Sequence, residues 1–133
     1  MKVSDIYAMA YPMVAKPRNL DGLPVGEGDA PDYSAAVPQL VNALTIEQAA
    51  LAAIYAQVSG AESGFSPTRV NGIDDLMPLP ERFTPAAVYF IAEKLSYKNS
   101  YEAAALLHRL YLEEIARIRR ELPAVSESIV NRY

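Results

Sequence analysis

The segment GIDDLMPLPERFTP, residues 72–85, decides the fold, because it separates an irregular connector from two strongly patterned helices that follow it. Its prolines and paired aspartates are typical of a stiff, acidic connector. Thr84 followed by Pro85 predicts a capped helix start, since proline is favoured at the first helical position. We expect this helix to end near Lys98. Its inward face is predicted to consist of Val88, Ile91, Ala92 and Leu95.

A last helix is predicted from a capping-box-like start at Asn99 and Glu102 to about Leu122, where Pro123 stops it. Apolar residues at three- and four-residue spacing define the face expected to be buried. The core of this stripe is Ala103, Leu107, Leu110, Ile115 and Ile118, widened by Ala104, Tyr111 and Leu122. The opposite face carries charges of alternating sign at four-residue spacing, namely Arg109, Glu113, Arg117 and Glu121.

Two further helices are predicted upstream. Ser4 is a good N-cap for a short helix over residues 5–14. Its inward face is expected to hold Ile6, Met9, Ala10 and Met13. Asp32 can cap a longer helix that ends at Ser59-Gly60. The apolar seam of that helix is Val37, Val41, Leu44, Gln48, Leu51, Tyr55 and Val58.

Two features complicate that longer helix. Pro38 predicts either a kink or a late start, because proline is tolerated only in the first turn. Thr45 and Gln48 match a capping box, which would allow a break near Leu44. Residues 15–31 and 60–83 form two long connectors rich in proline and glycine. The sequence therefore predicts an all-α fold, a small bundle of about four helices with two long irregular connectors and an extended C-terminal tail. Residues 1–122 form a single helical domain and 123–133 form the tail.

The amino-acid composition argues against several classes of function. The chain has 133 residues and a formal net charge of −4, which argues against a dedicated nucleic-acid binder. It has no cysteine, which excludes disulfides and thiolate metal sites. The apolar stretch 33–58 contains a proline and several amides, so we interpret it as a buried helix of a soluble protein rather than a membrane span. The N-terminus does not match a signal peptide.

No candidate for catalysis, cofactor binding or metal binding emerges. Asp74-Asp75 lacks the spaced oxygen ligands of a calcium loop. His108 is the only histidine, and the sequence near it offers neither a nucleophile nor an orienting partner. Glu113-Glu114 lacks the histidines of di-iron bundles. The first connector contains Gly22, Gly26 and Gly28. These glycines lack the Gly-Lys-Ser/Thr context of a phosphate loop. We therefore predict that the protein is not an enzyme.

Two groups of residues are interface candidates. The first is basic and lies on the last helix, where it is either a solvated face or a docking edge for an acidic partner. It comprises Arg109, Arg117 and Arg120, beside Arg119. The second is apolar and lies in the tail, which either frays or docks on a neighbouring subunit. It comprises Val125, Ile129, Val130 and Tyr133.

Four stretches between Ser34 and Leu122 resemble the head–tail connector (adaptor) proteins of tailed phages. They are VPQLVNAL, GIDDLMPLPERF, AAVYFIAEKLSYKNS and LLHRLYLEEIARIRRELP. In this family an aliphatic-Asn-aliphatic helix step is followed by a short Asp-Asp/Leu-Pro connector and two further helices. Residues 15–31 and the N-terminus depart from the simplest pattern, so the subfamily is open.

The resemblance implies a structural role without catalysis. It implies a homo-oligomeric ring that docks to the portal protein, continues the DNA channel, and meets a tail or stopper protein. DNA is then only passing cargo, and the protein is located in the virion and, during assembly, in the cytoplasm of the bacterial host. A ring needs two different complementary surfaces per subunit, and an acidic balance suits a channel to which DNA must not adhere. The alternative is a helical protein–protein interaction or regulatory module without catalytic activity.

Overall fold

The computed structural model describes residues 1–17, 32–60 and 65–122, and this part of the chain is all-α, as predicted. Its five α-helices are α1 (Val3–Ala10), α2 (Val37–Glu47), α3 (Ala49–Val58), α4 (Thr84–Ser96) and α5 (Tyr101–Arg120). The 3-10 turn η1 (Tyr11–Met13) follows α1, and the 3-10 turn η3 (Glu81–Phe83) precedes α4. Extended pairing within these ranges is limited to an isolated bridge between Lys2 and Leu76.

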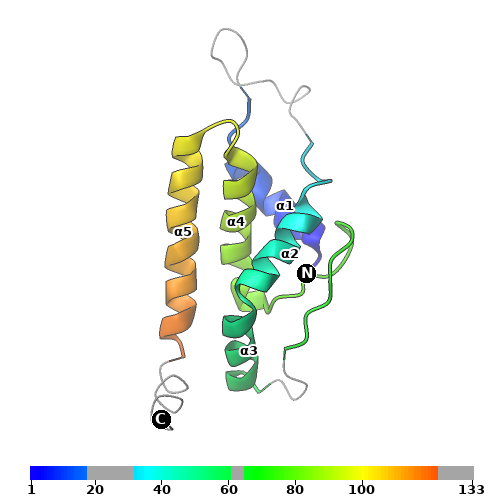
Figure 1. The fold of residues 1–133 in the computed structure, drawn as a ribbon, viewed down its shortest axis with the longest axis vertical. Coiled ribbons are helices and arrows are strands. Elements are labelled where there is room, and N and C mark those ends of the chain that lie inside the picture. The colour runs from blue at the N-terminus through cyan, green and yellow to red at the C-terminus, as the bar shows by residue number, and fades with distance from the viewer. Residues whose placement is uncertain (18–31, 61–64, 123–133) are drawn as a thin grey trace.

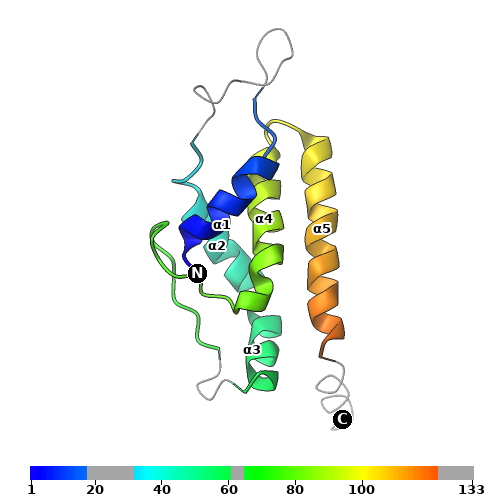
Figure 2. The same ribbon diagram turned by 180° about the vertical axis from the view of Figure 1, so that it is seen from behind.

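Helix α4 is the centre of the bundle. Helix α5 runs antiparallel along one side of it, and α1 and α2 lie on the other side, with the 65–80 connector beyond α2 (Figures 1 and 2). Most of α4 is buried, and Ala86, Ala87 and Ala92 are small core residues of this helix. Phe90 and Ile91 are buried beside them. Small side chains let neighbouring helices approach closely, which explains how one slender helix can be packed on several sides.

The predicted cap of α4 is wrong. Thr84 is the first helical residue rather than the N-cap, and Pro85 is therefore second. The reason is η3, whose Phe83 N–H donates to the Pro80 carbonyl at 2.9 Å and leads directly into α4. Phe83 is buried and meets the Tyr55 ring edge-on, with 6.0 Å between ring centroids. The turn thus fixes the start of α4 by burying an aromatic ring.

The predicted cap of α5 is displaced by one residue. Ser100 is the N-cap, and its Oγ accepts a hydrogen bond from the Ala103 N–H at 3.1 Å. Asn99 instead donates its side-chain amide to the Ala15 carbonyl and the Tyr33 hydroxyl, both at 3.1 Å. The predicted stripe is correct at its centre, since Leu107, Ile115 and Ile118 are buried, whereas Ala103 and Leu110 are only partly covered.

Helix α1 begins earlier than predicted, so Ser4 lies inside it rather than at its cap. The connector carbonyls explain the difference, because Asp75 and Ile73 accept the N–H groups of Val3 and Ser4 at 2.9 and 2.7 Å. The first turn therefore needs no serine cap. The helix also gives way to η1 before Val14. Of its predicted inward face, Ile6 and Ala10 are buried, but Met9 and Met13 are exposed.

The predicted long helix is two helices. It starts late, at Val37 with Pro38 in the first turn, and Asp32 caps a turn at Ser34 N–H (2.9 Å) rather than the helix. The helix is interrupted at Gln48, which separates α2 from α3. Gln48 is buried and donates its amide to the Tyr111 hydroxyl oxygen at 2.6 Å. At the end of α3, Val58 is exposed, and Gly60 takes the positive φ of 82° that favours glycine.

The connector is held by two side chains from the stretches that carry the family resemblance. The side-chain amide of Asn42 in α2 forms two hydrogen bonds with the main chain of Val70. It donates to the Val70 carbonyl and accepts from the Val70 N–H, both at 2.8 Å. Asp75 accepts the N–H groups of Asn71 and Gly72 at 2.8 and 3.1 Å, and these bonds hold the pKa of Asp75 below its usual range. These residues therefore maintain the scaffold in this structure.

Replacing Asn42 by alanine is expected to lower the free energy of unfolding by about 1–3 kcal/mol, because two main-chain groups of Val70 lose their partners. Chemical denaturation measures the loss. Gln39→Ala is the matched control, since Gln39 is exposed on the same helix. An Asn42 variant as stable as the Gln39 variant would mean that the hydrogen bonds to Val70 contribute nothing to the free energy of unfolding.

Candidate interaction surfaces

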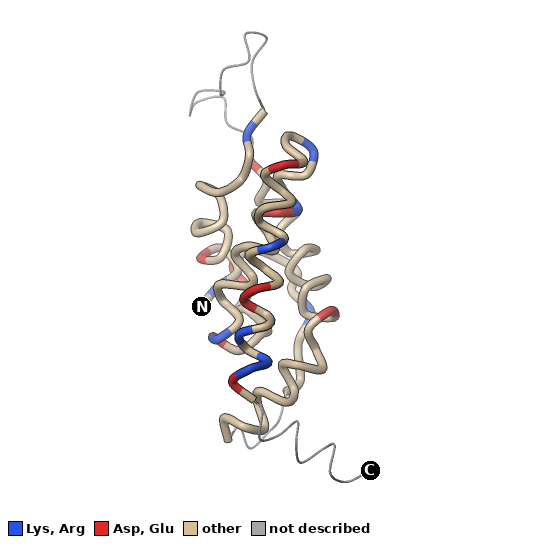
Figure 3. Tube along the Cα trace, turned by 90° about the vertical axis from the view of Figure 1, so that its left-hand side faces the viewer, with Lys and Arg blue, Asp and Glu red and all other residues tan. Residues whose placement is uncertain are grey.

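Charged residues are spaced along α5 (Figure 3). Arg109, Glu113 and Arg120 are exposed there. The ion pairs differ from the predicted four-residue alternation. Arg117 pairs with Glu114 at 2.7 Å, three residues away, and Glu121 pairs with Arg82 of η3 at 2.8 Å. The α5 charges therefore serve partly to fasten the helix to η3.

Arg82 joins the end of α5 to the turn before α4. Its Nη1 lies 3.5 Å from Glu114 Oε2, and its Nε and Nη2 both donate to the Glu121 carboxylate. Hydrogen bonding to Glu121 raises the pKa of Arg82, and the same bonds lower the pKa of Glu121. Of the predicted basic interface candidates, Arg117 is thus engaged with Glu114, whereas Arg109 and Arg120 lie in solvent.

The predicted apolar interface candidates lie in the tail, outside the residues that the structure describes. They are Val125, Ile129, Val130 and Tyr133. The first connector also falls outside these residues from position 18 to position 31.

Two exposed leucines of α5 lie among its charged residues, and neither was predicted as an interface residue. Leu106 is 55% exposed and Leu112 is 52% exposed. Both fall off the buried three- and four-residue stripe of this helix. That displacement is the signal that would have found them, since a leucine outside the stripe must face solvent or a partner.

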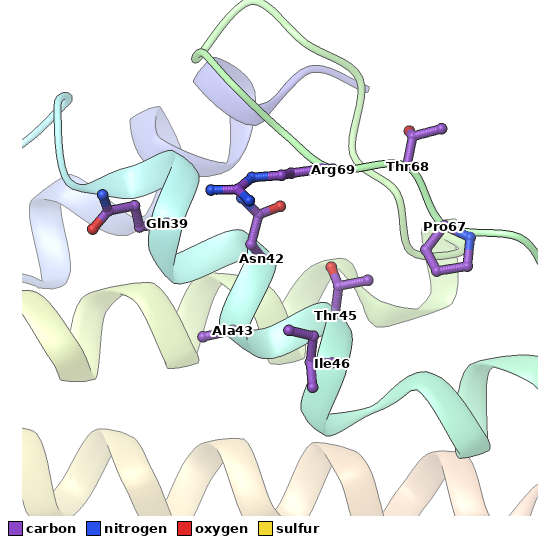
Figure 4. Close-up of a pocket in the computed structure, with 8 residues that line it drawn as sticks. All are labelled: Gln39, Asn42, Ala43, Thr45, Ile46, Pro67, Thr68 and Arg69. Atoms are coloured by element: carbon purple, nitrogen blue, oxygen red, sulfur yellow. The ribbon is translucent and has the colours of Figure 1, made fainter.

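An open groove lies between α2 and the connector (Figure 4). It encloses about 520 Å³, with Ala43 and Ile46 on the helix side and Pro67, Thr68 and Arg69 along the other side. Ile46 is 79% exposed. Among the eight described residues lining the groove, Arg69 carries the one charge. No local pattern in the sequence marks this groove, because its two walls lie far apart in the chain and are brought together by the fold, in which Asn42 binds the main chain of Val70.

Two other apolar surfaces occur on the bundle. A second groove of about 360 Å³ lies between α1 and α4 and is lined mainly by apolar side chains. Its lining is Met9, Met13, Thr84, Pro85, Val88 and Tyr89. Helix α3 has no charged residue, yet only Ala52 and Ala56 of it are buried. A helix that is apolar all round is usually covered on all sides, so α3 also offers surface to a partner.

His108 has an orienting partner, contrary to the sequence analysis. Its Nδ1 lies 2.9 Å from Oε1 of Glu93, a buried residue of α4, and the other carboxylate oxygen lies 3.1 Å from the Lys94 ammonium. Close by, burial raises the pKa of Tyr111 to about 12, and its hydroxyl oxygen accepts from Gln48. None of these groups lines the two grooves described above. The cluster cross-links α4, α5 and the α2–α3 break.

Within the described ranges, histidine, aspartate and glutamate side chains form no group of three that could hold a metal ion. No helix in those ranges combines the length and apolar character needed to cross a membrane. Comparisons with protein-family models, with curated proteins and with solved structures give no match for this chain.

Proposed function

We propose that this protein is a structural subunit of the head–tail connection of a tailed phage or prophage. It forms a homo-oligomeric ring that docks to the portal protein and continues the DNA channel toward a tail or stopper protein. It carries out no reaction, and DNA passes through the ring as cargo. In this proposal the protein is located in the virion and, before assembly is complete, in the host cytoplasm.

One observation carries the proposal. Several exposed large apolar side chains of the bundle lie on different elements, with Ile46 on α2, Leu106 and Leu112 on α5, Met9 on α1 and Met13 on η1. Exposed apolar patches mark surfaces that partners cover. A symmetric pair would need one self-complementary patch, whereas a ring needs two unlike patches on each subunit. Several patches on one small bundle suit the second arrangement.

The resemblance to connector proteins adds a second line of support. In the stretches that carry it, Asn42 holds the connector against α2 and the Asp75 carboxylate stabilises the connector itself, as expected for a framework rather than a reaction centre. The net charge of −4 suits a channel wall, since phosphate binding requires basic contacts. The alternative, a helical protein–protein interaction or regulatory module without catalytic activity, would bind a partner protein and would not need the portal.

Deleting residues 124–133 is expected to leave the fold intact and to weaken ring formation or portal binding. The fold should survive because α5 ends at Arg120 and Leu122 completes the buried stripe. Assembly should weaken because the deletion removes Val125, Ile129, Val130 and Tyr133. Thermal melting measures the fold. Size-exclusion chromatography with light scattering at high concentration, with and without portal protein, measures assembly.

Two results bear on different parts of this proposal. Assembly unchanged by the deletion would leave the contacts to the helix faces and residues 15–31. A full-length chain that associates neither with itself nor with portal protein at any concentration tested would contradict the connector function and favour a regulatory module.

A further inference from the structure

We infer that residues 123–133 of one copy dock as an extended arm in the α2–connector groove of the next copy. The groove is the one that runs between Ile46 of α2 and Arg69 of the connector (Figure 4). This inference rests on the proposed ring and names the contact by which the tail builds it. The occupant of the groove is thus the tail of a neighbouring chain.

The groove combines apolar surface with one positive charge. Ala43, Ile46 and Pro67 supply the apolar surface, and Ile46 is the most exposed large apolar side chain among the described residues. Arg69 carries the one charge of the lining, and none of the ion pairs between described residues involves it. An occupant that fits brings apolar side chains and a carboxylate, because opposite charges across an interface fix its register.

The connector side of the groove also offers main-chain groups. Residues 65–69 form no hydrogen bond with the other described residues, whereas Val70, the next residue, is bonded to Asn42 through its N–H and its carbonyl. An extended peptide can pair with free main-chain groups of this kind, as in strand addition. The groove therefore suits an extended segment better than a helix, whose own main-chain groups are already paired.

The sequence of the tail matches the groove if the tail binds in an extended form. Alternate side chains of an extended chain share one face. One face of PAVSESIVNRY then carries Val125, Glu127 and Ile129, with about 7 Å between successive members. Arg132, the one basic residue of the tail, falls on the opposite face. The first face therefore places a carboxylate between two apolar side chains, which is the complement of apolar surface beside Arg69.

The positions of the two surfaces favour docking between copies. The tail follows Leu122 at the end of α5, on one side of α4, whereas α2 and the connector lie on the other side of α4 (Figures 1 and 2). Eleven residues of extended chain span at most about 36–40 Å, which exceeds the length of α5 itself, about 30 Å. Each copy thus offers two unlike surfaces on opposite sides, and contacts of that kind close into rings.

Reciprocal charge reversal in the full chain tests the contact. Arg69→Glu and Glu127→Arg should each weaken association about tenfold or more, since each places like charges together. The double variant, Arg69→Glu with Glu127→Arg, should recover association to within about threefold of wild type, because the pair is restored with its signs exchanged. Sedimentation or light scattering measures association, with portal protein present if the wild type requires it.

Two matched controls make the same kind of charge change away from the contact. Arg132→Glu reverses a charge on the other face of the tail, and Lys98→Glu reverses one in the turn between α4 and α5. Both variants should associate as the wild type does. Arg69 and Lys98 are exposed, so their variants should also melt within a few degrees of wild type.

Disulfide trapping tests whether the tail reaches a second copy. The chain has no cysteine, so Thr68→Cys and Ser128→Cys can be prepared as separate proteins and mixed under oxidising conditions. A mixed disulfide between the two chains should form readily, because Thr68 lines the groove and a disulfide requires close approach. Lys98→Cys mixed with Ser128→Cys should give much less of it, since Lys98 does not line the groove.

The outcomes distinguish this contact from the proposed function. If the single reversals leave association unchanged, or the double variant does not recover it, the tail contact is wrong while the connector function stands. If Arg69→Glu weakens association but Glu127→Arg does not, the groove takes another occupant, such as residues 18–31 of a neighbour, and the inference fails. It fails too if the reversals lower the melting temperature without changing association, because the tail then covers the groove of its own chain. If the wild type associates neither with itself nor with portal, both proposals fail.

Discussion

Replacing Tyr111 by alanine is expected to lower the free energy of unfolding by about 3–5 kcal/mol, the usual cost of deleting a buried aromatic ring. Tyr111 is 1% exposed, and its ring packs on Phe90 with 5.4 Å between centroids. Its hydroxyl oxygen accepts the buried Gln48 amide, which would lose its partner in the variant. Denaturation in urea or guanidinium measures the loss.

Tyr111→Phe is the matched control, because it keeps the ring and removes only the hydroxyl. It should cost about 1–3 kcal/mol through the unpaired Gln48 amide. It also isolates a pH effect. Because burial raises the pKa of Tyr111 from 10.0 to about 12, the stability it contributes is complete below pH 10 and is lost as pH rises through 12. The Phe variant should lose less stability over that range. An alanine variant less than about 1 kcal/mol below wild type would show that the ring is not packed as described.

Replacing Leu107 by alanine is expected to cost about 2–5 kcal/mol, because the residue is 6% exposed and belongs to the α4–α5 core. Its sequence neighbour supplies the control. Leu106 is 55% exposed on the same helix, so Leu106→Ala should stay within about 0.5 kcal/mol of wild type. The two variants make the same chemical change one residue apart, and only their burial differs.

The two leucines should also separate in assembly. Leu106→Ala should keep the melting temperature and weaken association, since exposed apolar side chains are the surfaces that partners cover in the proposed ring. Leu107→Ala should lower the melting temperature. Equal losses of stability in the two variants would mean that α5 is rotated about its axis relative to the structure.

The helices could be predicted from the sequence because their apolar residues repeat every three or four positions, and burial follows that period. The stripe of α5 is clear in this way, from Leu107 through Ile118. The caps were harder to predict. Val3 and Ser4 find their acceptors at Asp75 and Ile73, far along the chain, and the local contact at this end is between the Lys2 N–H and the Asp5 carboxylate. In α1, tertiary hydrogen bonds therefore take the place of the predicted serine cap.

Thr45 and Gln48 allowed a break in the long helix near Leu44, and the break lies at Gln48. Two polar side-chain contacts of α5 could not be predicted in this way. Gln48 reaches Tyr111 across 63 positions and Glu93 reaches His108 across 15, so neither pair shows as a motif. The exposure of the α5 arginines could be predicted because they occupy the polar face of the helix. The groove could not, since its walls are Ile46 and Arg69 on segments joined only by the fold. The exposed leucines could have been recognised as residues outside the stripe.

The docking of α1 on the connector and on α4 has a consequence for protein synthesis. Ala15 donates to Ser96 Oγ, 81 positions later, and Val3 needs the carbonyl of Asp75. At about 5–20 residues per second, the ribosome delivers those partners about 4–16 seconds after α1 itself. A helix of eight residues does not persist alone in water. During that interval the apolar face of α1, with Val3, Ile6 and Ala10, is open to chaperones, so α1 is translated before its partners and folds only once they are made.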